Sequence, residues 1–138
     1  MEVLEKRKKL REEVLEKARR WANTLPFKAT VILVGSYARG DFNLWSDVDL
    51  IVISDGLRGK PLSRLKVLDV QRGFQVIPLT SSEFERLVRK RDLLAIEALE
   101  RGIILRDDLK VVRKQPQLKN FLKSLDRLLT SSQPPSSS

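Results

Sequence analysis

The chain contains no cysteine and no histidine among its 138 residues, and these two absences restrict its chemistry. Without cysteine it can form neither disulfide bonds nor zinc–thiolate sites. Without histidine it lacks the side chain that serves most often as a general base and as a metal ligand near neutral pH. Any catalysis must therefore use carboxylates, hydroxyls, lysine, arginine or a hard cation bound by oxygen atoms.

Long apolar runs are absent as well. No segment contains the roughly 20 consecutive apolar residues that a membrane-spanning helix needs. Residues 1–13 are densely charged and have no apolar core, unlike a secretory signal. We therefore expect a cytoplasmic protein without a membrane partner, and the length predicts a single domain.

Positive charge is abundant. Lysine and arginine number 27 against 18 aspartates and glutamates, which gives a formal net charge of +9. This balance favours anionic partners such as nucleotides, nucleic acids or an acidic protein surface. A solvated surface rich in salt bridges explains the same charges, and composition alone does not separate the two interpretations.

Hydrophobic periodicity predicts alternating helices and strands over most of the chain. Strands are predicted over residues 30–34, 47–53, 74–79 and 103–105, and helices over 2–22 and 62–70, from residue 81, and from 92 to 100. We predict an α/β (α+β) fold with a small mixed sheet of three to four strands and helices packed mainly on one side.

The C-terminal part of the sequence has a different character. Apolar residues recur at helical spacing from Leu118 to Leu129, which predicts an amphipathic helix over 116–130. Residues 131–138 are a low-complexity segment that we predict to be disordered. We therefore divide the chain into a domain over 1–115, this helix and a tail. The apolar stripe of the helix suits either a partner protein or the chain's own domain.

Two short motifs point to chemistry, and the first is Gly35-Ser36, directly after the strand predicted over 30–34. Glycine allows a ligand to approach the backbone closely. The amides of a following helical turn and the serine hydroxyl can then donate to a phosphate. On its own, this pair is a weak signal, because any ordinary turn between a strand and a helix can contain Gly-Ser.

The second motif is Asp47-Val48-Asp49, at the start of the next predicted strand. Residues i and i+2 of a strand point to the same face, about 6.7 Å apart. Two neighbouring carboxylates repel one another, and protonation or a bound cation relieves the repulsion. Mg²⁺ is the natural cation because it prefers oxygen ligands. An isolated Asp-x-Asp also fits a solvated strand start, so the combination of the two motifs is the informative observation.

Gly35-Ser36, ten intervening residues and Asp47-x-Asp49 together resemble the nucleotidyltransferase superfamily of DNA polymerase β. The fuller strings Gly35–Gly40 and Ser46–Leu50 resemble its minimal nucleotidyltransferase branch. The resemblance implies a nucleotidyltransferase-like fold in which Gly35 and Ser36 bind the phosphates of a nucleoside triphosphate, with ATP expected. It also implies that Asp47 and Asp49 are catalytic and hold Mg²⁺. The implied reaction transfers a nucleoside monophosphate to an acceptor hydroxyl and releases pyrophosphate.

The resemblance assigns further residues around this site. Arg39 is either a phosphate contact or a surface salt-bridge residue, and Tyr37 and Trp45 are expected to pack around the site. The family's third carboxylate lies on the neighbouring strand, where the best match is Gln75. A neutral amide is a poorer ligand for Mg²⁺ and cannot accept a proton. The resemblance therefore leaves a second metal ion, and with it the rate of catalysis, in question.

Relatives of this minimal type resemble antitoxins that pair with HEPN-type helical proteins, which implies such a partner here. An alternative follows from Gln75, namely a catalytically weak or inactive nucleotide-binding module that acts through protein association. A nucleic-acid-binding module would explain the net charge. It would not explain the spaced aspartates, which repel a phosphate backbone unless a metal is present.

Overall fold

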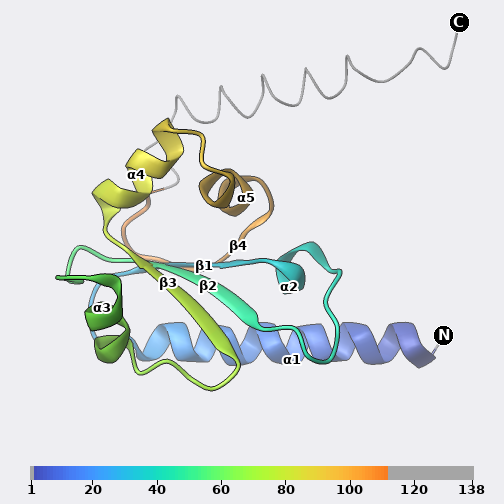
Figure 1. The fold of residues 1–138 in the computed structure, drawn as a ribbon. Coiled ribbons are helices and arrows are strands. Elements are labelled where there is room, and N and C mark those ends of the chain that lie inside the picture. The colour runs from blue at the N-terminus through green and yellow to red at the C-terminus, as the bar shows by residue number, and fades with distance from the viewer. Residues whose placement is uncertain (1, 112–138) are drawn as a thin grey trace, which may run out of the picture.

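The computed structural model describes residues 2–111 (Figure 1). The predicted elements within this range are all present, with bounds that differ by a few residues. The predicted helix over 116–130 and the predicted tail over 131–138 lie outside the described residues. In chain order the elements are α1 (Glu2–Thr24), β1 (Thr30–Val34), α2 (Ser36–Arg39), β2 (Val48–Ile53), α3 (Pro61–Leu68), β3 (Phe74–Leu79), α4 (Ser81–Arg89), α5 (Leu93–Arg101) and β4 (Ile103–Asp107).

The four strands form one mixed sheet in the order β3-β2-β1-β4. Strand β1 is antiparallel to both of its neighbours, whereas β2 and β3 are parallel. A parallel pair needs a crossover connection, and α3 provides it. The starts of β2 and β3 therefore lie side by side, next to the end of β1. None of the helices in the described part combines the length and apolar character that crossing a bilayer requires.

Helices cover both faces of the sheet, which corrects the expectation that they lie mainly on one side (Figure 1). The reason is that β1 and the apolar part of β2 have no polar face. Alternate residues such as Val31 and Leu50 pack toward α1 and α3, while Ile32 and Ile51 pack toward α4 and α5. A strand that is apolar at every position must be covered on both faces. The predicted mixed α/β class itself is confirmed.

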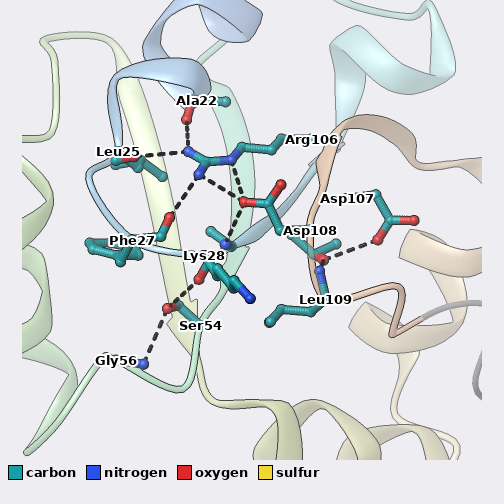
Figure 2. A network of polar contacts seen from close by, with 12 residues as sticks. Ala22, Leu25, Phe27, Lys28, Ser54, Gly56, Arg106, Asp107, Asp108 and Leu109 are labelled. Carbon is teal, nitrogen blue, oxygen red and sulfur yellow. Dashed lines mark hydrogen bonds and ion pairs between the residues drawn. The ribbon is translucent and has the colours of Figure 1, made fainter.

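A polar cluster ties β4 to the end of α1 (Figure 2). The Arg106 guanidinium donates to three carbonyl oxygens that follow or end this helix, at 2.8 to 3.0 Å: those of Ala22, Leu25 and Phe27. It also pairs with Asp108 at 2.7 Å. The Ala29 amide donates to Asp108, and this hydrogen bond is the main reason why the pKa of Asp108 is lowered. We call these residues the Arg106 clamp.

Candidate active site

The residues that the two motifs single out meet where β1 ends and β2 and β3 begin. Val34, the last residue of β1, pairs with Asp49 of β2, and Asp49 pairs on its other side with Gln75 of β3. Gly35 follows Val34, so the glycine turn and the aspartates are brought together by the antiparallel pairing of β1 with β2. Asp47 lies just before β2 and is exposed, whereas Asp49 is half-buried.

Gly35 is required at its position for two reasons. Its φ of 76° lies in the region that residues with a side chain rarely adopt. A Cβ atom there would also collide with the Asp49 carboxylate oxygen Oδ2. The neighbour that requires glycine here is the Asp49 carboxylate, and the close approach of a phosphate ligand to this backbone stays a prediction.

The turn after Gly35 offers hydrogen-bond donors beside this carboxylate. The carbonyl oxygen of Gly35 accepts from the amides of Ala38 and Arg39, at 3.1 and 3.0 Å, which holds α2 in place. Within residues 2–111, neither the Ser36 hydroxyl nor the amides of Ser36 and Tyr37 donate to a protein acceptor. The turn therefore combines free donors with a neighbouring carboxylate, as a site for a metal-bound phosphate requires.

Helix α1 contacts this turn through the side chain of Arg11. Arg11 donates to the carbonyl oxygens of Tyr37 and Ala38, at 2.8 and 3.0 Å. These carbonyls belong to the C-terminal end of α2, where a cation is favourable. Arg11 therefore anchors the far end of the turn and leaves its donor end open.

Electrostatic repulsion concentrates at Asp49. Burial raises the pKa of this carboxyl group, and the negative charges of Asp47 and Glu97 raise it further, while Arg39 acts in the opposite direction. The ionised form of Asp49 is therefore disfavoured in the protein alone, and a bound cation would stabilise it. The carboxylates of Asp47 and Asp49 suit one Mg²⁺, which prefers hard oxygen ligands. Among the described residues, no group of three or more acids is arranged to hold a metal ion.

Glu97 on α5 is a site residue that the sequence argument missed. Its Oε1 accepts from the Gly35 amide at 3.3 Å and from Arg39 Nη1 at 2.6 Å. Arg39 also pairs with Asp41 at 3.2 Å, so it forms the salt bridges that were one of its two expected roles. One sequence signal could have revealed Glu97, because it is the only charged residue in the apolar helical run of residues 93–99.

Gln75 pairs with Asp49 in the parallel register of β2 and β3, and its assignment to the third-carboxylate position stays a prediction. Ile51 and Ile77, two residues further along each strand, pack toward α4 and α5, so Asp49 and Gln75 share that face. The side chain of Gln75 is exposed. Strand β3 therefore contributes the neutral amide of Gln75 beside Asp49. The further carboxylate near Asp49 is that of Glu97, on α5.

The two aromatic residues of this region differ in their surroundings. Tyr37 is buried and stacks on Phe42 with ring centroids 4.5 Å apart, as expected. Trp45 is 86% exposed, which corrects the expectation that it packs around the site. It follows Leu44, which is also exposed, in the loop before Asp47. This loop and the first turns of α1 line a groove of about 400 Å³.

Residues 7–125 match the family model of the nucleotidyltransferase domain, a range that includes the glycine turn and both aspartates. No match was found among curated proteins. Among solved structures, a similar one is described as "Crystal structure of the toxin-antitoxin with AMP-PNP", with 16% sequence identity and a TM-score of 0.49. That similarity covers 85% of this chain and 95% of the other.

Proposed function

The chain belongs to the nucleotidyltransferase domain family, and from this premise we propose that it transfers a nucleoside monophosphate from a nucleoside triphosphate to an acceptor hydroxyl. ATP is the expected donor and Mg²⁺ the expected cofactor. The observation that carries this proposal is the close approach of Gly35 to the Asp49 carboxylate. It sets the free hydrogen-bond donors of the turn beside carboxylate oxygens, and these are the kinds of groups that a phosphate and a hard cation would need.

Each group of the site has a role in this reaction. The Ser36 hydroxyl and the free amides of the turn donate to phosphate oxygens and orient the triphosphate. Asp47 and Asp49 would hold the magnesium ion. When bound, this ion neutralises charge on the triphosphate and stabilises the departing pyrophosphate. The acceptor hydroxyl gives up its proton to water, its oxygen forms a bond to the α-phosphorus, and the bond to pyrophosphate breaks.

Binding and transfer can be tested separately. Mg·ATP should raise the melting temperature of the wild-type protein, because a ligand bound only by the folded state stabilises it. Replacing both aspartates, Asp47→Asn with Asp49→Asn, should remove the magnesium-dependent part of this increase and abolish pyrophosphate release. Asp69→Asn is a matched control, since Asp69 is an exposed aspartate outside the site. A double variant that responds to Mg·ATP like the wild type would refute the assigned site.

A second candidate function follows from Gln75. An amide beside Asp49 cannot accept the proton of the acceptor hydroxyl and is a poor ligand for a second metal ion. The alternative is therefore a nucleotide-binding protein that acts through association and transfers slowly or not at all. Mg·ATP binding without pyrophosphate release, in the presence of a true acceptor, would favour this alternative.

The acceptor is proposed to lie on a partner protein of the HEPN type, as the resemblance to antitoxin-like relatives implies. The predicted helix over 116–130, with its apolar stripe, would supply the contact. Co-purification from the native extract identifies the partner. Changing Leu122 and Leu125 to glutamate should then reduce its recovery without altering Mg·ATP binding. Recovery that is unaffected by these changes would remove the support for this contact.

A further inference from the structure

The Glu97 carboxylate occupies the position where the proposed function needs an anion. It accepts from the Gly35 amide and from the Arg39 guanidinium. In the sequence these two residues precede and follow Ser36, whose donors are free within the described part of the chain. A phosphate group bound at this turn would seek the same two partners, because oxyanions and carboxylates use the same N–H donors. Glu97 and a bound phosphate would therefore compete for the same two donors, the Gly35 amide and the Arg39 guanidinium.

Charge makes this competition stronger. Glu97 is close enough to Asp49 for the two negative charges to interact. Within the described residues, Arg39 is the cation that pairs with Glu97. A triphosphate would bring several further negative charges to the same turn, and it would attract Arg39 while repelling Glu97. On charge alone, nucleotide binding therefore favours a conformation in which the Glu97 carboxylate is turned away from the turn.

The fold does not depend on the position of this carboxylate. Helix α5 is held by Ala95, Ile96 and Ala98, which are buried against the sheet. The side chains of Glu97 and Arg39 are 30% and 35% exposed. Ion pairs with this degree of exposure contribute little to stability. The Glu97 side chain can therefore leave its partners at small cost to the folded state.

A second place for the carboxylate is available on the same helix. Glu97 and Arg39 border a shallow groove that Arg101 also lines. Arg101 is exposed and lies four residues after Glu97, at the spacing that allows an ion pair along a helix surface. This spacing would allow the Glu97 carboxylate to exchange Arg39 for Arg101 by rotation of its side chain, without movement of the helix.

We propose that Glu97 is an internal substitute for phosphate, which holds the Gly35 amide and Arg39 in the nucleotide-free protein and transfers to Arg101 when a triphosphate binds. This inference rests on the proposed function, since it concerns the same nucleotide site. Glu97 is a positioning residue in this scheme. It keeps Arg39 beside the turn, and it sets the affinity because each bound nucleotide must displace it.

Titration of Mg·ATP by calorimetry tests this exchange. Glu97→Gln keeps the size of the side chain but removes its charge, and should tighten binding by about two- to fivefold, the range that an exposed ion pair provides. Glu100→Gln is the matched control, because Glu100 lines the same groove on the same helix without contacting the turn. It should leave the affinity unchanged. Unchanged or weaker binding by the Glu97→Gln variant would overturn the inference.

Two further variants test the partners of Glu97. In an Arg39→Ala background, Glu97→Gln should lose most of its effect, because the competition is largely for Arg39. Arg101→Gln should weaken Mg·ATP binding, since the displaced carboxylate then lacks its second partner. It should have no such effect once Glu97 is replaced. Equal effects of Arg101→Gln in both backgrounds would contradict the exchange.

The outcome also separates this inference from the proposed function. If neither the wild type nor any Glu97 variant binds Mg·ATP, both are wrong. If all bind equally, the nucleotide site stands and the exchange falls. If Glu97→Gln tightens binding while pyrophosphate release is absent with a true acceptor, the exchange stands and the transfer reaction is wrong.

Discussion

At the Thr30 end of β1, the Arg106 clamp pairs its charges with nearby acceptors. Arg106 donates to three carbonyls and to Asp108, which in turn accepts from the Ala29 amide. At the Val34 end, the negative charges of Asp47 and Glu97 both disfavour the charge of Asp49, and the donors of Ser36 have no protein acceptor within residues 2–111. The same strand therefore begins among groups that stabilise the fold and ends among groups that suit a ligand.

The two ends of β1 should respond differently to substitutions. Changes in the Arg106 clamp should lower stability and leave nucleotide affinity unaffected. Changes around Asp49 should alter binding or rate, and removing a carboxylate there should raise the stability of the protein without ligand.

The largest effect is expected when an acid is restored at Gln75. Gln75→Glu places a carboxylate beside Asp49 in the strand pair, where it can bind metal or accept a proton. Loss of a group that stabilises the transition state costs about 2 to 3 orders of magnitude in rate, so its gain should raise pyrophosphate release toward that extent. Mg·ATP affinity should change little. Gln71→Glu, an exposed position before β3, is the control.

Two results would count against this prediction. Rapid release by the natural protein with its true acceptor would mean that the third acid is dispensable or supplied elsewhere. No gain from either Gln75→Glu or Gln75→Asp, with nucleotide binding intact, would favour the association module. The restored acid should also lower the melting temperature in the absence of magnesium, because it adds a further charge to a repelling group.

Arg106→Ala should produce the largest loss of stability. It removes the side-chain donor of three carbonyls and one of the two donors to the Asp108 carboxylate, which keeps the Ala29 amide, and we expect a loss of about 3 kcal/mol in the free energy of unfolding. Urea denaturation measures it. Arg106→Lys retains the charge but not the forked geometry, so it should recover only part of the loss. The folded variant should bind Mg·ATP with wild-type affinity, and a weaker affinity would contradict the division between the two ends.

A glycine comparison isolates the contact between the turn and Asp49. Gly35→Ala combines a positive φ with a collision against the carboxylate, whereas Gly73→Ala has a similar φ of 86° and open space around it. The strain alone should cost about 1 to 3 kcal/mol in Gly73→Ala, and at least as much in Gly35→Ala, whose ψ of −155° lies in a region that is nearly exclusive to glycine. The part of the loss in Gly35→Ala that disappears when Asp49 is also changed to alanine measures the collision. Equal losses in the two single variants would show that the close approach has no energetic weight.

The sequence was informative where local signals decide structure. The apolar run before Gly35 correctly predicted a strand. The helix predicted from residue 81 is also present, and Thr80 and Glu83 form two reciprocal capping hydrogen bonds at its start. Glu97 was missed because its role depends on tertiary packing. It lies 62 residues after Gly35 in the sequence, and the two residues meet only in the folded chain. The coverage of both sheet faces likewise depends on how distant helices pack. Local patterns contain neither kind of information.

The smallest effect concerns the stability cost of the Asp49 charge. The pKa of Asp49 is higher in the folded protein than its ordinary value, so ionisation of this carboxyl group opposes folding. This loss of folding stability is absent below the ordinary carboxyl pKa and is complete above the raised folded-state pKa. Asp49→Asn should therefore melt at a higher temperature than the wild type at pH 7 without magnesium. The difference should shrink as the pH falls toward the ordinary carboxyl pKa. With Mg·ATP present the order should reverse, because only the wild type keeps both carboxylates for the cation. A variant that is less stable than the wild type at pH 7 without magnesium would show that Asp49 supports the fold, as the Arg106 clamp does.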